Sequence, residues 1–165
     1  MAPIIVPSNA VKDMINEAAA QTFTHVTGQE LHWYYCMDLQ NGSPLNPFIR
    51  HFVENLHSGK TSYHLARLLL VIGMPTMITH NFDVQSEIVN SCSGTLTHIN
   101  YTTNMEGHCH AILCVVHTPF TSGEMLPHLQ PFHSIVLEDT IDIVLYHPHS
   151  KQSFKFKYVQ LLLVL

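Results

Sequence analysis

Ser153-Phe-Lys-Phe-Lys-Tyr-Val159 alternates large apolar side chains with lysines, and this alternation predicts a β-strand that is buried on one face. Its three aromatic residues fall on one side of the strand, whereas Lys155 and Lys157 fall on the other. A strand of this kind needs neighbouring strands and a core for its aromatic face. The stretch therefore places this end of the chain in a β-rich fold.

Short apolar runs recur upstream of this strand, and turn sequences separate them. The runs are Leu68 to Ile72, Thr76 to Thr79, Thr95 to Tyr101, His110 to His117, Ser134 to Leu137 and Ile141 to Tyr146. Asn104-Met-Glu-Gly107 and His147-Pro-His-Ser150 are typical of hairpin turns, because Asn, Gly and Pro adopt tight turn conformations. Strands spaced about 8 to 12 residues apart favour a small antiparallel barrel.

The N-terminal region has a different pattern, which predicts an α/β unit. Pro3-Ile-Ile-Val-Pro7 is an apolar run bounded by prolines, and it indicates a strand that ends at a turn. Apolar residues then recur at three- and four-residue steps as far as Gly28, which is typical of a helix. Ser8 or Asn9 provides its N-terminal cap and Gly28 its C-terminal cap. Further along, we expect a strand within residues 29–37, a short helix over Phe48–Leu56 and a polar link at 57–62.

The composition limits what the chain can do. It has 165 residues, of which 46% are hydrophobic and 12% are charged, and its formal net charge is −5. Tight binding of nucleic acid needs clustered cations, so this chain alone is not expected to bind it strongly. No apolar stretch is long enough to span a membrane, and four cysteines without a CxxC pair suit a reducing compartment. We therefore expect an intracellular protein with no membrane partner.

Two local motifs contain parts of known sites without completing their pattern. Ser58-Gly-Lys-Thr61 has the lysine and threonine of a phosphate-binding loop, but that loop requires another glycine where Glu54 stands. We therefore interpret it as a solvated linker. His108-Cys-His110 and His147-Pro-His149 offer ligands for zinc or copper, but they lack the paired spacing of structural zinc sites. The residues alone indicate no internal active site, and a histidine-rich metal binder remains an alternative.

A longer motif runs from Gly73-Met-Pro-Thr-Met-Ile-Thr-His-Asn-Phe-Asp-Val84 to Ile88-Val-Asn-Ser-Cys-Ser-Gly-Thr-Leu96. It resembles the C-terminal part of the helicases encoded by Helitron transposons and their Pif-type relatives, which are RecD-like superfamily-one DNA helicases. That family has a glycine, a Met-Pro-Val-Met-Ile-like strand, an asparagine, a variable loop, then Val-Asn-Gly and a second glycine. Residues 3–16 and 137–160 are similar to two further stretches of the same family.

The resemblance implies a fold of the α/β plus β class, in which a partial RecA-like α/β lobe carries an inserted SH3-like antiparallel β-barrel. Residues 1–62 would form part of the second RecA-like lobe and residues 63–157 the barrel. Residues 158–165 would be a truncated strand that returns to the lobe. Ser91 stands where the family usually has glycine; if the backbone there takes a positive φ, serine costs about 1 kcal/mol.

The resemblance also implies which chemistry is missing. Intact members bind ATP and Mg through a phosphate-binding loop and carboxylates of the first lobe, and a Gln-Gly-containing motif and an arginine finger in the second lobe complete the site. None of these motifs is present in this sequence. Phosphoryl transfer depends on such groups around the γ-phosphate. We therefore expect a truncated piece of an ATP-dependent DNA helicase that has no catalytic residues and no cofactor of its own. It would be nuclear if the parent role is retained.

Any inherited role would be contact with single-stranded DNA. The candidate residues are Ser8, Asn9, Lys12, Asn90, Lys155 and Lys157. Ser8 and Asn9 could donate hydrogen bonds to phosphate or cap the helix, and Asn90 could be a structural turn residue. So few cations predict weak, salt-sensitive binding. The alternative is a non-enzymatic β-barrel that acts as a protein-interaction module, with the missing helicase portions among its partners.

Overall fold

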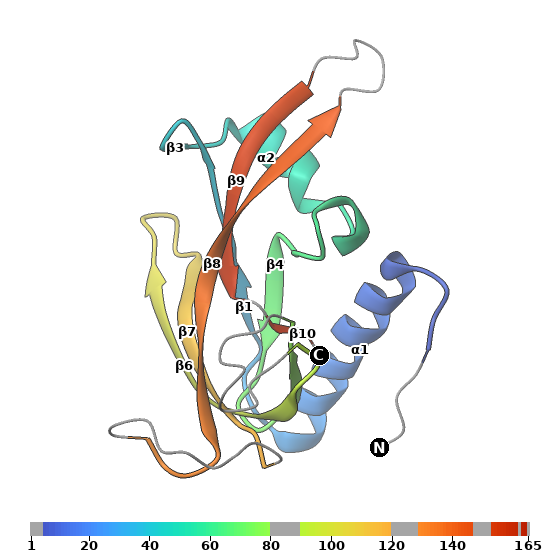
Figure 1. Ribbon diagram of the computed structural model, residues 1–165, viewed down its shortest axis with the longest axis vertical. Coiled ribbons are helices and arrows are strands. Elements are labelled where there is room, and N and C mark those ends of the chain that lie inside the picture. Colours follow the sequence, from blue (N-terminus) through green and yellow to red (C-terminus); the bar gives the residue numbers. More distant parts are fainter. Residues whose placement is uncertain (1–4, 80–89, 120–128, 147–152, 162, 165) are drawn as a thin grey trace.

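The computed structural model describes residues 5–79, 90–119, 129–146, 153–161 and 163–164 (Figure 1). Its helical elements are α1 (Asn9–Thr27), α2 (Pro47–Glu54) and a short 3-10 turn, η1 (Ser58–Lys60). Its strands are β1 (His32–Tyr35), β2 (Met37–Gln40), β3 (Ser43–Pro44), β4 (Arg67–Leu70), β5 (Pro75–Ile78), β6 (Ser93–Thr103), β7 (Cys109–His117), β8 (His133–Tyr146), β9 (Ser153–Leu161) and β10 (Leu163–Val164). Neither of the two described α-helices is long and apolar enough to cross a membrane.

Helix α1 begins and ends where the sequence predicts. Ser8 is the N-cap, and its hydroxyl accepts a hydrogen bond from the backbone N–H of Val11 at 3.3 Å. Gly28 ends the helix with a φ of 67°, a conformation that a residue without a Cβ adopts at little cost. The strand predicted before the helix is wrong over residues 5–7, which form no strand, and its remaining residues lie outside the described part.

The strands form a mostly antiparallel sheet in the order β10-β5-β6-β7-β8-β9-β2-β3. Strand β1 joins this sheet by pairing with β7, and β4 pairs with β1. Strand β8 connects the two halves of this sheet (Figure 1). Its first part, from His133 to Leu137, pairs with β7, and its second part, from Glu138 to Tyr146, pairs with β9. Two runs that the sequence predicts as separate strands are therefore one long strand.

The predicted SH3-like barrel is wrong, because the sheet is not closed. Among the described residues, β10 and β3 stand at the two ends of the strand order, and β10 pairs with β5 whereas β3 pairs with β2. A barrel requires its first and last strands to pair with each other. Strand β8 instead continues beyond the residues that pair with β7 (Figure 1). Its second part pairs with β9, and β9 pairs with β2, so these strands lengthen an open sheet.

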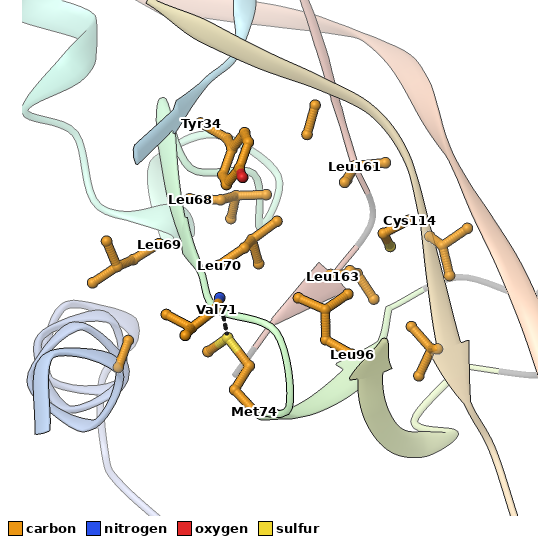
Figure 2. Packing of buried hydrophobic residues seen from close by; sticks show 14 of the residues in the cluster. Tyr34, Leu68, Leu69, Leu70, Val71, Met74, Leu96, Cys114, Leu161 and Leu163 are labelled. Carbon is orange, nitrogen blue, oxygen red and sulfur yellow. Dashed lines mark hydrogen bonds between the residues drawn. The ribbon is translucent and has the colours of Figure 1, made fainter. Parts of the chain in front are cut away.

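Two hydrophobic clusters hold the sheet to the helices. The larger one brings β4 and the residues after it against β6, β7 and the C-terminal strands, and Ala20 of α1 belongs to it. Figure 2 shows Leu70, Leu96 and Leu163 meeting at its centre, where the Val71 N–H donates to Met74 Sδ at 2.8 Å. The smaller cluster lies under α2 and contains Val53, Phe156 and Tyr158. Burial of the aromatic face of β9 confirms the alternation predicted for this strand.

The glycines of the longer motif occupy positions that require them. Gly73 has a φ of 88°, and a Cβ on Gly94 would lie 2.4 Å from the carbonyl oxygen of His117 on the neighbouring strand. Ser91 has a φ of 73°, which confirms that serine stands at a left-handed position. Residues 80–89 of the motif lie outside the described part.

Strand pairing crosses the predicted boundary between residues 62 and 63. Strand β1 pairs with β4, and β2 pairs with β9, so residues on both sides of that boundary share one sheet. Parallel pairing, which RecA-like lobes use throughout, is limited in the described residues to β1 beside β7. The division into a partial lobe and an insertion stays a prediction.

Candidate nucleic-acid interface at the start of helix α1

The start of α1 presents polar groups that its own helix does not satisfy. The first backbone N–H groups of any α-helix have no partner within it, and they carry a partial positive charge. Here they belong to Asn9 and Ala10, directly after the Ser8 cap, and the first turn contains no acidic residue. Ser8 therefore acts as the cap that the sequence allows, and Asn9 opens the helix beside it.

A turn from a distant part of the sequence docks against this helix end. Both oxygens of the Asp13 carboxylate accept hydrogen bonds from Ser58, one from its backbone N–H at 2.8 Å and one from its hydroxyl at 2.9 Å. Ser58 is fully buried, so these two bonds fix η1 to α1. Figure 1 shows the start of α1 beside the turn that follows α2.

Docking of η1 creates a shallow hollow between the two elements. Its walls are Ser8, Asn9 and Lys12 on one side and His57, Gly59 and Lys60 on the other. A Cβ on Gly59 would lie 2.8 Å from Nδ2 of Asn9 and 3.1 Å from Nδ1 of His57, so the glycine allows both side chains to lie over the turn. Nδ1 of His57 is buried and has no hydrogen-bond partner among the described residues.

Two lysines give the hollow its charge, and Tyr63 lies beside one of them in the neighbouring hollow. Lys12 Nζ lies 3.4 Å from Asp13 Oδ1 and 6.0 Å from the centre of the Tyr63 ring. Lys60 is exposed, and Tyr63 is 66% exposed. Ser62 and Tyr63 both have positive φ values, of 51° and 69°, which is costly for residues with a Cβ and is often found at binding sites.

Asn90 lies near this group, whereas the two lysines of β9 belong to a separate element. Asn90 lines a neighbouring hollow together with Lys12 and Tyr63. Lys155 and Lys157 point outward from β9, as the alternation predicts, and Lys155 Nζ pairs with Asp142 Oδ2 at 2.9 Å. The hydrogen bond from Lys155 lowers the pKa of the Asp142 carboxyl, so Lys155 is already paired with a negative charge.

The Ser58-Gly-Lys-Thr61 segment is not a phosphate-binding loop, and it is also not a solvated linker. It follows helix α2 and precedes strand β4, whereas a phosphate-binding loop follows a strand and precedes a helix. The Ser58 and Thr61 side chains are buried and bonded within the protein. The linker interpretation is therefore wrong for these two residues, although Gly59 and Lys60 are exposed.

The histidine motif at 108–110 does not assemble a metal site in the described part of the chain, where no group of three potential ligands is found. His108 stacks on Tyr35 with ring centres 4.3 Å apart. His110 contacts the backbone oxygen of Tyr35 at 2.8 Å and Glu138 at 2.6 Å. The second histidine motif, at 147–149, lies outside the described residues.

This chain is similar in fold to part of a Pif1 helicase. The Pif1 helicase from Candida albicans matches 99% of this chain with a TM-score of 0.50 at 13% sequence identity. Unliganded Pif1 from Bacteroides sp. and the Bacteroides enzyme in complex with ADP-AlF3 and single-stranded DNA each match 90% of this chain, with TM-scores of 0.43 at 13% identity. The chain spans 36% of the Candida protein and 28% of each of these Bacteroides proteins. No protein-family model and no curated protein matches this sequence.

The similarity to Pif1 concerns the fold, and the geometry adds residues that the sequence did not indicate. The structure brings Ser8, Asn9 and Lys12 together, as the sequence predicts, and Asn90 lies beside them. Sequence reasoning missed His57, Lys60, Tyr63 and the Asp13 carboxylate that positions their segment. The lysine next to Gly59 was visible in the sequence, but its proximity to α1 depends on the tertiary fold.

Proposed function

We propose that this chain is a helicase-related segment that contacts single-stranded DNA weakly through the start of α1 and hydrolyses no ATP by itself. The observation that carries the proposal is the convergence of Asn9, Lys12 and Lys60 on the hollow at the helix N-terminus. The similarity in fold to part of a Pif1 helicase supports the assignment to helicases. The earlier prediction of a Helitron origin rests on the motif at residues 73–96.

The chemistry of the hollow suits a phosphate group. The free N–H groups of Asn9 and Ala10 point along the helix axis, and an anion there is stabilised by the helix dipole. Lys12 and Lys60 add charge from both sides. Tyr63, which is mostly exposed, provides a face on which a base can stack.

The arrangement also accounts for weak binding. The hollow has two lysines, one of which already contacts Asp13, and the whole chain has a formal net charge of −5. Two phosphate contacts make a small electrostatic contribution that salt readily removes. We therefore propose binding that is measurable at low ionic strength and lost near physiological salt.

ATP and Mg do not fit the residues that are present. The Thr61 hydroxyl, which a phosphate-binding loop would direct to Mg, is buried and donates to the backbone oxygen of Ser58. Glu54 precedes the turn where that loop needs a glycine, and its carboxylate would repel a phosphate. The proposal therefore contains no step through a nucleotide, and catalysis would belong to portions of the helicase not represented in these residues.

Fluorescence anisotropy with a labelled oligothymidylate tests the proposed contact. Lys12→Gln combined with Lys60→Gln should weaken binding strongly at low salt, because both cations of the hollow are lost. Lys155→Gln is the matched control, since this lysine is paired with Asp142 on another element. If the control substitution weakens binding as much as the double substitution does, DNA contacts a different surface and the proposal fails.

A second candidate function is a protein-interaction module, and exposed apolar side chains favour it. Phe48 of α2 is 86% exposed and Phe52, one turn later, is 54% exposed, while Met14 of α1 is 71% exposed. The chain spans only 36% of the Candida Pif1 protein, so the rest of a similar helicase would be the natural occupant of such faces. Co-purification of a helicase polypeptide with the tagged chain, and its loss on Phe48→Ser, would support this role.

A further inference from the structure

Two histidines face each other across the ladder between β7 and β8. His117 is the last residue of β7, His133 is the first residue of β8, and the two are direct partners in the antiparallel register. Their ring centres lie 5.0 Å apart, and the ring planes are inclined by 46°. Direct cross-strand partners project from the same face of a sheet, so both imidazoles can reach one ligand. Local sequence motifs do not contain this pair, because the two residues meet only through strand pairing.

The separation of the two rings matches that of two imidazoles on one metal ion. A Zn–N bond of about 2.1 Å places the centre of an imidazole ring about 3.2 Å from the ion, so two rings at a tetrahedral angle have centres about 5.2 Å apart. At the right angle of a tetragonal copper(II) site, the same geometry gives about 4.5 Å. The observed 5.0 Å lies between these two values. The spacing therefore allows both rings to bind a single ion.

Each histidine has a ring nitrogen that is available to a metal. Nδ1 of His133 lies 3.0 Å from the backbone oxygen of Pro131, and because a carbonyl oxygen only accepts, Nδ1 carries the proton. Nε2 of the neutral ring then has a free lone pair, and metal-binding histidines are commonly oriented by a hydrogen bond of this kind from the other nitrogen. The His117 ring contacts His133 but takes part in no hydrogen bond or ion pair within the described residues.

The backbone beside both histidines is held in place by buried contacts. The N–H of Thr118 donates to the backbone oxygen of Phe132 at 2.7 Å, and the buried hydroxyls of Thr118 and Ser134 lie 2.8 Å apart. Phe132 has a φ of 61°, which is unfavourable for a residue with a Cβ and is often found at binding sites. These contacts connect the residue after His117 to the residues on either side of His133. The two rings are therefore preorganised, and binding an ion costs little ordering.

We propose that His117 and His133 bind one divalent transition-metal ion of the zinc or copper class, with water in the remaining coordination positions. Imidazole nitrogen is a preferred ligand of these ions. Strands β6, β7 and β8 contain no lysine or arginine, so no cation of these strands repels the metal. No third histidine, cysteine or carboxylate joins the pair within the described residues, so the site has open positions. It involves none of the residues of the proposed DNA contact.

Calorimetric titration of the chelator-washed full chain with zinc chloride, and separately with copper(II) chloride, tests the proposal. Both ions should bind, and copper(II) should bind more tightly. His117→Gln and His133→Gln should each weaken the tightest zinc binding at least about tenfold, because each removes one of the two protein ligands. His98→Gln is the matched control, since His98 is an exposed histidine on the neighbouring strand β6 and its loss should leave the affinity unchanged. Equal affinity of the wild type and either pair variant would overturn the inference.

Ring-nitrogen NMR of the wild type separates metal binding from a merely structural role of the two histidines. The chain has 14 histidines, and long-range ¹H–¹⁵N spectra report on each ring separately. One equivalent of zinc should shift Nε2 of His133 and a nitrogen of His117, while Nδ1 of His133 stays protonated. Zinc should also raise the melting temperature of the wild type and of His98→Gln, but not that of either pair variant. Zinc-induced shifts confined to other histidines would overturn the inference, as would equal thermal stabilisation of the wild type and the pair variants.

Discussion

Replacing Asp13 with alanine should destabilise the protein substantially, because this carboxylate satisfies two donors of a fully buried residue. The Ser58 backbone N–H and hydroxyl lie 2.8 Å and 2.9 Å from its two oxygens, and Asp13 has only 13% of its side chain exposed. An unsatisfied buried donor costs about 1 to 3 kcal/mol, so Asp13→Ala should lower the free energy of unfolding by about 2 to 4 kcal/mol. Urea denaturation followed by circular dichroism measures this change.

Glu17→Ala is the matched control, because it removes a carboxylate from the same helix one turn later. Glu17 accepts a longer hydrogen bond, at 3.4 Å, from the exposed Gln21 side chain, and its loss should change the free energy of unfolding by less than about 0.5 kcal/mol. A value for Asp13→Ala that is no larger than that of Glu17→Ala would refute the claim that this carboxylate fixes η1 to α1.

Three further outcomes follow from the fold. Ser91→Gly should raise the free energy of unfolding by about 1 kcal/mol in urea denaturation, since Ser91 has a φ of 73°, and a lower stability would contradict this. Cys114 should react with iodoacetamide only after unfolding, because it is fully buried and burial raises the pKa of its thiol to about 12; peptide mass spectrometry that finds Cys114 alkylated as fast as Cys109 would show otherwise. Combined Phe48→Ser and Phe52→Ser should shift the isolated chain towards the monomer in light scattering, and an unchanged distribution would rule out this face as the cause of association.

Local sequence patterns predicted much of the secondary structure because short-range physics determines it. The cap at Ser8, the left-handed end at Gly28 and the alternation in β9 each depend on a few neighbouring residues. Strand β8 was divided in the prediction because Glu138, Asp139 and Thr140 interrupt its apolar pattern. In the structure these polar residues still pair with β9, since a strand continues where polar side chains can face solvent.

Closure of the sheet could not be predicted from the same patterns. Alternation and turn sequences specify hairpins between consecutive strands, but a barrel depends on whether the outermost strands meet. In the described residues the two outermost strands do not pair with each other: β10 pairs with β5, and β3 pairs with β2. The candidate site was predictable only in part. Ser8, Asn9 and Lys12 are close in sequence and lie at the start of one helix, so local patterns identify them. Lys60 is far from them in sequence and lies beside them because the Asp13–Ser58 contact holds its turn against α1.

The salt dependence of DNA binding tests the central claim most directly. Single-stranded DNA gives a slope of about −0.7 per neutralised phosphate in a plot of log affinity against log salt, so Lys12 and Lys60 together predict about −1.4. Affinity for an oligothymidylate should then fall about 17-fold between about 20 mM and about 150 mM salt. The double variant Lys12→Gln, Lys60→Gln should show a slope near zero at whatever residual affinity remains. The same slope in the wild type and the double variant would contradict a phosphate contact at the start of α1.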